Sequence, residues 1–240
     1  MIKGVIFDLD QTLIDSLEAV TEAFNAGTAL LGLKPVPKEV LARFLDKGLR
    51  MSDMLIELYP SVFKEEQKLQ TCQSEIRKVY LQLEPEKVFL NPGAKRTIKH
   101  LKQRGIKIGI VTGRMSKGEG KWLELSRLHI HQFIDSMVTA AEAPGKPAPD
   151  GLIKCMGELG LYPEECIFVG DSQLDIIAGK KAGVKTVALY SGVSNKDTLA
   201  EQGPDFVLDN LNSLVPLLSK LQKTEEGKHG SVYRIIQICC

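Results

Sequence analysis

Short apolar runs recur along the 240-residue chain, and helical patterns separate most of them. The first run ends at Leu9, and a run of this kind is typical of a strand buried on both faces, as in a parallel sheet. Further runs lie at 105–112, 165–171 and 184–190, and weaker ones lie at 133–139 and 205–210. Strands that alternate with helices predict an α/β fold with a doubly wound parallel sheet.

One long stretch interrupts this alternation. From Ser16 to about Pro92 the apolar residues recur at helical spacing, and no convincing strand is found. One such stripe consists of Leu17, Val20, Phe24 and Leu31. The segments expected to be loops between the helices are GLKPVP (32–37), YPS (59–61) and EPE (84–86).

The interruption predicts the domain organisation. We expect residues 16–90 to form a small helical cap, inserted into an α/β core that consists of residues 1–15 and 91–222. The alternative is a helical decoration packed statically on the sheet. The tail at 223–240 receives no role.

The composition excludes several classes of protein. The chain has 31 Lys and Arg against 30 Asp and Glu, so its net charge of +1 attracts neither nucleic acid nor an anionic membrane. No apolar run approaches the ~20 residues that span a bilayer, and the early acid Asp8 is unlike a signal peptide. The five cysteines are scattered without a CxxC pair, which is typical of reduced thiols. We therefore expect a cytoplasmic globular protein, either a monomer or a dimer.

The strongest chemical signal is a pair of acids, Asp8 and Asp10, directly after the first predicted strand. Residues two apart on an extended chain point to the same side, and open α/β sheets bind ligands beyond the carboxyl ends of their strands. Two close carboxylates are costly unless a cation or a proton lies between them. The pair therefore indicates a cation site, with an acidic turn capped by Asp10 as the plain alternative.

Three further polar segments follow predicted strands. Thr112 and Gly113 offer a hydroxyl and backbone N–H groups that could hold a phosphoryl oxygen. Lys146 lies among prolines in GKPAPD, which suits a point charge directed at a dianion. Asp171 and Asp175 lie one helical turn apart, and acids here suit Mg²⁺. Each residue alone could be a helix cap or a solvated loop residue, but their order at successive strand ends predicts one site.

In this constellation the sequence resembles the haloacid dehalogenase superfamily, specifically its phosphatase branch with a helical cap. The likeness covers residues 1 to about 220, and the matching motifs are DLDQTLIDS, VTGR, GKPAPD and GDSQLDI. Within that branch the chain is similar to phosphoglycolate phosphatases and to β-phosphoglucomutase-like proteins. The resemblance implies a Mg²⁺-dependent phosphatase that hydrolyses a small phosphorylated metabolite, a soluble phosphomonoester, through an aspartyl-phosphate.

The resemblance also implies a role for each motif residue. Asp8 would be the nucleophile, and Asp10 would first protonate the leaving oxygen and then activate water. For the first step Asp10 would need a pKa raised by desolvation. The phosphoryl group would be held by Thr112, Gly113 and Lys146. Mg²⁺ would be bound by Asp8, the backbone carbonyl of Asp10, and Asp171, with Asp175 in support.

Two positions depart from the family pattern. Gln11 replaces the commoner glycine in the first turn, so the local backbone is expected to differ slightly. Gly113-Arg114 replaces the Asn or Ser that usually follows the motif Thr. Arg114 either adds a phosphate contact or points to solvent.

Three alternatives to a phosphatase stay open. Mutases of the β-phosphoglucomutase type carry an Arg in a K-G-x-x-R segment, whereas Lys47-Gly48-Leu49-Arg50-Met51 has its Arg one place early, which favours hydrolysis. A phospho-accepting receiver has adjacent acids, about half this length and no helical insertion. A silent binding module would need no intact motifs.

The cap offers candidate residues for substrate selection. Core motifs bind only the phosphoryl group and the metal, so discrimination is expected from the cap, which we predict to cover the leaving group. Basic residues cluster there around Gly48: Arg43, Lys47 and Arg50. They would suit a substrate with a carboxylate or sugar hydroxyls, and a solvated basic helix end is the alternative.

Overall fold

A six-stranded parallel sheet forms the centre of the structure, a computed structural model that describes residues 1–190 and 196–222. The strands are β1 (Gly4–Phe7), β4 (Lys107–Thr112), β5 (Ser136–Thr139), β6 (Cys166–Gly170), β7 (Lys185–Leu189) and β8 (Phe206–Leu208). Their order is β5-β4-β1-β6-β7-β8, so β1 is central and Phe7 lies between Ile110 of β4 and Val169 of β6. The predicted doubly wound α/β sheet is confirmed, and the strand order reverses beside β1, where such sheets bind ligands.

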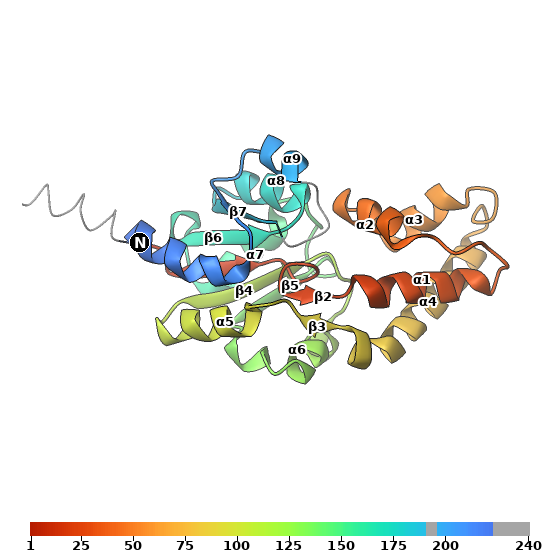
Figure 1. The fold of residues 1–240 in the computed structure, drawn as a ribbon, viewed down its shortest axis with the longest axis horizontal. Helices are drawn as coiled ribbons and strands as arrows, with labels where there is room; N and C mark the ends of the chain where they lie inside the picture. Colours follow the sequence, from red (N-terminus) through yellow and green to blue (C-terminus); the bar gives the residue numbers. More distant parts are fainter. Residues whose placement is uncertain (191–195, 223–240) are drawn as a thin grey trace, which may run out of the picture.

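Helices cover both faces of the sheet (Figure 1). Along β1, Val5 and Phe7 belong to the core on one face and Ile6 belongs to the core on the other, as the two-residue period of a strand requires. The first face is covered by α5 (Ala94–Gln103), α6 (Leu123–Arg127) and a helix over 214–222. The second face is covered by α7 (Asp150–Leu159) and α8 (Gln173–Lys181), and α9 (Lys196–Glu201) packs beside α8. Short 3₁₀ turns lie at Gly118–Lys121, His131–Phe133, Pro163–Glu165 and Leu211–Ser213.

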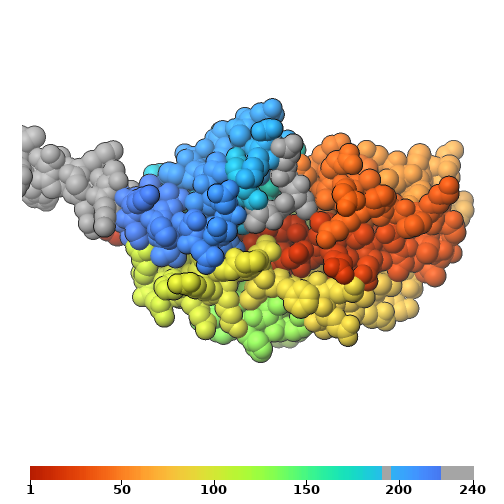
Figure 2. Space-filling model, in the orientation of Figure 1, coloured from red at the N-terminus to blue at the C-terminus, as the bar shows by residue number. Residues whose placement is uncertain are grey.

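The helical insertion lies beyond one end of the sheet and forms that end of the molecular surface (Figures 1 and 2). Its helices are α1 (Leu17–Ala29), α2 (Lys38–Asp46), α3 (Met51–Leu58) and α4 (Glu66–Lys87). They pack around a hydrophobic cluster of their own, which includes the fully buried Phe24, Leu41 and Leu55. The insertion therefore carries a core that does not depend on the sheet.

Two details of the insertion differ from the sequence-based expectations. The EPE segment was expected to be a loop, but α4 runs through it to Lys87 with Pro85 inside its last turns. Near a helix end proline removes a single hydrogen bond, and the packing of α4 outweighs that loss. Leu31 was expected in the buried stripe, but α1 ends at Ala29 and Leu31 is exposed.

The chain passes between sheet and insertion along a pair of very short strands. β2 (Ile14–Asp15) and β3 (Phe89–Leu90) form an antiparallel ladder in which Ile14 faces Leu90 and Asp15 faces Phe89. No strand was expected in this part of the sequence, because two residues are too few to show a period. The crossings lie near the expected boundaries at 16 and 90, and the division into domains stays a prediction.

Two expectations from the composition, on membrane spans and on cysteines, can be compared with the described residues. Within them no helix has both the length and the apolar character needed to cross a membrane. Their cysteines, Cys72, Cys155 and Cys166, are free and buried. The predicted tail at 223–240 lies outside the described residues.

Candidate active site

Side chains from two adjacent strand ends, the first turn of a helix and one loop meet at the carboxyl edge of the sheet. Asp8 follows β1, Asp171 follows β6, and Asp175 lies in the first turn of α8. Among the described residues, carboxylate oxygens of these three acids all lie within 4.8 Å of one another. Lys146, from the loop after β5, places its Nζ 2.5 Å from Asp8 Oδ1 and 2.6 Å from Asp175 Oδ1. We call this group the carboxylate cluster.

Local structure fixes each acid of the carboxylate cluster. Asp175 caps α8 together with Ser172, whose backbone N–H donates to Asp175 Oδ2 over 3.0 Å. Asp171 accepts a hydrogen bond of 2.8 Å from the Thr12 hydroxyl. Gly170 allows the close approach, because a Cβ there would lie 2.4 Å from the Cβ of Asp175. Thr12 was not singled out in the sequence, since a Thr two residues after an acid has many local uses.

The electrostatics of the cluster favour a bound cation. Burial raises the pKa of Asp8 to about 7, against the opposing effect of Lys146, and Asp175 and Asp10 raise it further. Burial also raises the pKa of Asp171, and the neighbouring charges of Asp8 and Asp175 act in the same direction. Burial lowers the pKa of Lys146, but its two carboxylate partners outweigh that effect and hold it above its usual range. Lys146 pairs with two of the three carboxylates, so the site has negative charge in excess whenever all three are ionised.

The donor set fits a hard divalent cation. It consists of carboxylate oxygens that are buried and close together, which suits Mg²⁺ or a similar ion. Asp8, Asp171 and Asp175 are therefore the side chains that could hold a metal. From Asp10 only the backbone carbonyl was expected at the metal, and the carboxylate of Asp10 points to a different partner.

Asp10 binds an arginine instead. Arg114 Nε donates to Asp10 Oδ2 over 2.8 Å, and Arg114 Nη2 donates to Oδ1 over 2.7 Å. The Ser16 hydroxyl donates to the same Oδ1 over 2.5 Å. Burial raises the pKa of Asp10, but Arg114 and Ser16 outweigh burial and hold that pKa below its usual value. The pKa of Asp10 is therefore shifted in the direction opposite to the one that the first step would need. Arg114, which was expected to add a phosphate contact or to point to solvent, pairs with Asp10 instead.

The turn between the two acids has a left-handed residue. Gln11 has φ of 62°, a conformation that glycine adopts readily and that costs other residues about 1–2 kcal/mol. Asn91 supports the turn, since its side-chain amide donates to the carbonyls of Gln11 and Thr12 over 2.8 and 3.0 Å. Gln11 therefore adopts a conformation typical of the glycine that is commoner at this position.

The predicted phosphate-binding residues lie at the same edge. Thr112 ends β4, is buried, and accepts a hydrogen bond of 3.3 Å from the backbone N–H of Arg114. Gly113 borders open space, because nothing lies within 4 Å of where its Cβ would be. Thr112 and Gly113 therefore lie at the same edge of the sheet as the carboxylate cluster that contains Lys146.

The basic residues of the insertion lie around the turn between α2 and α3. Arg43, Lys47 and Arg50 are exposed, and Arg50 pairs with Asp53 inside the insertion at 3.1 Å. Gly48 has φ of 71°, and a Cβ there would lie 1.9 Å from Leu174 Cδ1 in the first turn of α8. The turn therefore touches the helix that carries Asp175.

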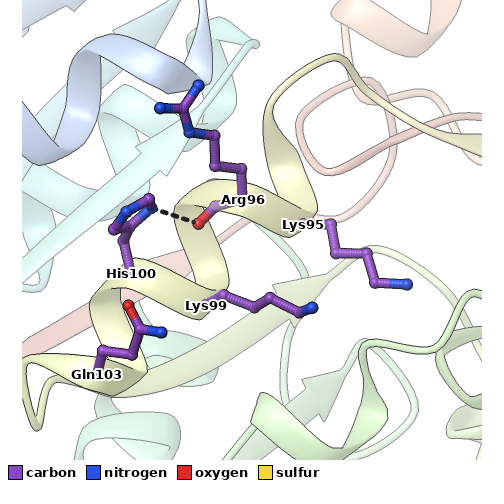
Figure 3. A pocket seen from close by; sticks show the side chains of 5 residues that line it. All are labelled: Lys95, Arg96, Lys99, His100 and Gln103. Carbon is purple, nitrogen blue, oxygen red and sulfur yellow. Dashed lines mark hydrogen bonds between the residues drawn. The ribbon is translucent and has the colours of Figure 1, made fainter.

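A separate basic depression lies on α5 and contains none of the predicted site residues (Figure 3). It is lined by Lys95, Arg96, Lys99, His100 and Gln103. None of these side chains is a carboxylate, so the depression lacks the acidic ligands of the carboxylate cluster.

Comparison with known proteins agrees with this arrangement. A family model described as haloacid dehalogenase-like hydrolase matches residues 5–189. The chain is 30% identical over 229 residues to a pyrophosphatase PpaX of Bacillus cereus, covering 93% of this chain and 99% of the relative. It is 31% identical over 226 residues to a pyrophosphatase PpaX of Bacillus mycoides, covering 92% and 98%.

Solved structures share the fold. A predicted phosphoglycolate phosphatase from Haemophilus somnus superimposes with a TM-score of 0.79 at 25% identity, covering 90% of this chain and 98% of that one. CbbY from Rhodobacter sphaeroides, solved with phosphate, superimposes with a TM-score of 0.76 at 22% identity, covering 89% and 96%.

Proposed function

The chain belongs to the haloacid dehalogenase-like hydrolase family, and from that premise we propose that it is a Mg²⁺-dependent phosphatase acting on a small phosphorylated metabolite. The carboxylate cluster carries the proposal. It combines a buried carboxylate, an ammonium group 2.5 Å away and two further acids at the carboxyl edge of a parallel sheet. This set can bind a phosphoryl dianion and a metal ion at once.

The reaction would proceed in two steps. In the first, an Asp8 oxygen attacks phosphorus, the bond to the leaving oxygen breaks, and Asp10 gives that oxygen a proton. In the second, Asp10 takes a proton from water, the water oxygen attacks phosphorus, and Asp8 is released with inorganic phosphate. Lys146, Thr112 and the backbone at Gly113 would hold the phosphoryl oxygens through both steps.

The ion pair of Asp10 bears on these steps. With its pKa held low by Arg114, Asp10 is an ionised carboxylate that suits the second step, where it accepts a proton. To serve as the acid of the first step it must bind a proton despite Arg114. A leaving group that departs without a proton places less demand on Asp10.

Mg²⁺ would be held by Asp8, Asp171 and Asp175 and, as the family resemblance implies, the Asp10 backbone carbonyl. When bound, it would supply positive charge that lowers the repulsion between the Asp8 carboxylate and the incoming phosphoryl group. Because Asp175 also binds Lys146 and Ser172, we assign it a supporting part.

Two substrate classes deserve direct comparison. The resemblance favours a small soluble phosphomonoester, whereas the curated relatives cited above are named pyrophosphatases. Inorganic pyrophosphate is compatible with the site, because its leaving group is phosphate, which needs little help from an acid. A phosphomutase of the β-phosphoglucomutase type stays the third candidate.

The proposal is tested with purified protein and three substrates: p-nitrophenyl phosphate, phosphoglycolate and inorganic pyrophosphate. We expect release of phosphate with Mg²⁺, none in excess chelator, and none from Asp8→Asn with Mg²⁺. Comparing kcat/KM among the three substrates identifies the substrate class. A mutase would convert β-glucose 1-phosphate into glucose 6-phosphate without releasing phosphate, which is tested by identifying the products. Full activity in chelator would disprove the metal assignment, and turnover by Asp8→Asn would disprove the nucleophile.

The basic residues of the insertion are proposed to select the substrate. Substituting Arg43, Lys47 and Arg50 in turn by Ala should lower kcat/KM for the best metabolite more than for p-nitrophenyl phosphate. An unchanged ratio in all three variants would place selection elsewhere.

A further inference from the structure

A partly buried polar cluster surrounds the Asp10 carboxylate, and its other members take no part in the chemistry described so far. Its members come from four separate parts of the chain, and we call it the Arg114 cluster. They are Asp10 after β1, Tyr80 of α4, Arg114 after β4, and Glu124 of α6.

Arg114 lies at the centre of this cluster, and each of its three nitrogens donates a hydrogen bond. Nε and Nη2 form the paired bonds to the two oxygens of Asp10. Nη1 donates to Glu124 Oε2 over 2.6 Å, and Nη2 also donates to the Tyr80 hydroxyl over 2.8 Å. Paired charge-assisted bonds fix the plane of a carboxylate as well as its position. The orientation of Asp10 therefore depends on the orientation of Arg114.

Glu124 and Tyr80 hold the guanidinium from its far side. The Tyr80 hydroxyl donates to Glu124 Oε1 over 3.2 Å, and the Arg114 guanidinium lies 5.6 Å from the centre of the Tyr80 ring. Glu124 is only 6% exposed, and leaving a carboxylate so buried is costly without a paired cation. Arg114 supplies the cation that pairs with the buried Glu124 carboxylate, and the acids of the carboxylate cluster are not its partners.

We propose that Arg114 is a positioning residue of the hydrolase reaction, which fixes the Asp10 carboxylate while Glu124 and Tyr80 fix Arg114. The inference rests on the proposed function, since it assigns to Asp10 the proton transfers described there. It differs from a phosphate contact, because four of the five guanidinium N–H groups already donate to Asp10, Glu124 or Tyr80. A residue that binds substrate would affect KM, whereas one that orients Asp10 affects kcat.

Arg127 offers a matched control. It lies on the same helix as Glu124 and also reaches α4, with Nε 3.3 Å from Glu84 Oε1 and further bonds to the carbonyls of Pro85 and Val88. These bonds tie α6 to the end of α4 but do not involve Asp10. Arg127→Gln should lower the melting temperature and leave kcat unchanged.

The test compares Arg114→Gln, Arg114→Lys and Arg127→Gln with the wild type in Mg²⁺. We expect Arg114→Gln to lower kcat by about 10–100-fold with KM changed less than threefold, as a small misplacement of a catalytic group does. The loss should be larger for an alkyl phosphate than for p-nitrophenyl phosphate, which needs less help from an acid. Arg114→Lys, which keeps the charge but not the paired bonds, should recover part of the loss. Free guanidinium should restore part of the Arg114→Gln activity and none of any loss in Arg127→Gln.

A double variant separates positioning from general destabilisation. Asp10→Asn should still release p-nitrophenolate in a burst as Asp8 is phosphorylated. If Arg114 acts through Asp10, adding Arg114→Gln to Asp10→Asn should slow this burst by less than twofold. A full additional loss, or a kcat loss in Arg127→Gln equal to that in Arg114→Gln, would overturn the inference. A large rise in KM at unchanged kcat would make Arg114 a substrate contact and overturn it too. A wild-type protein that releases no phosphate would instead disprove the proposed function.

Discussion

Replacing the proposed nucleophile should make the metal-free protein more stable. In the fold, Asp8 is buried beside other acids and its pKa is raised from 3.8 to about 7. Between these two values the folded chain keeps a proton that the unfolded chain has released. Wild-type stability therefore falls by about 1.36 kcal/mol per unit as the pH rises through this window, and it levels off above pH 7. The unfavourable ionisation of Asp8 thus costs at most about 4 kcal/mol.

The amide of Asp8→Asn cannot ionise, so the variant avoids this cost. Because relaxation and water entry relieve part of the repulsion in any real site, we expect about half of the limit, ~2 kcal/mol, at pH 8 in chelator. For a chain of this size that corresponds to a melting temperature about 4–8 °C higher. At pH 5 the advantage should be smaller, because the folded wild type then keeps more of its proton on Asp8.

Thermal unfolding followed by circular dichroism at pH 8 and pH 5 measures both effects. Asp209→Asn is the control, because Asp209 lies on the surface with a side chain that is 79% exposed, and it should change stability by less than about 0.5 kcal/mol. Excess Mg²⁺ should favour the wild type, since Asn is the poorer ligand. An Asp8→Asn variant that is no more stable than the wild type at pH 8, or equally advantaged at both pH values, would refute the electrostatic argument.

Other substitutions test the remaining features. Lys146→Met should abolish turnover and destabilise the metal-free protein by about 3–5 kcal/mol, because two buried carboxylates lose their cation. Calorimetry should show that Mg²⁺ restores part of the lost stability. An unchanged stability would contradict the pairing of Lys146 with these carboxylates. Gly48→Ala should cost about 1–2 kcal/mol of stability and also change kcat/KM, because its Cβ would press on Leu174. Gly32→Ala has a similar φ of 67° with nothing within 4 Å, so equal kinetic effects in the two variants would contradict the contact with α8.

Most strands of the sheet could be predicted because they are buried on both faces. Such strands show as uninterrupted apolar runs, as at 107–112 and 166–170, and runs of this kind need no tertiary information. The ladder of β2 and β3 could not be found in this way, because its two pairs depend on the return of a distant part of the chain. The helix through Pro85 was missed for a related reason, since packing decides where α4 ends.

The same distinction applies to the site, where residues at strand ends could be predicted and residues brought together by helix packing could not. The carboxylate cluster could be predicted because a parallel sheet brings the carboxyl ends of its strands to one edge, so order along the chain implies proximity. The Arg114 cluster could not. Tyr80 and Glu124 lie inside ordinary helical patterns, where an acid or a tyrosine is typical of a solvated face. Their meeting at Arg114 depends on how α4 packs against α6, which no local signal encodes.

The ladder between β2 and β3 also brings the two ends of the helical insertion together. Directly paired residues of antiparallel strands lie about 5 Å apart, so residues 16–88 begin and end at neighbouring points. A hairpin turn of two residues is short enough to span that gap. If the basic residues of the insertion select the substrate as proposed, changes confined to one segment with adjoining ends would alter selection and leave the strands that carry Asp8 and Thr112 in place.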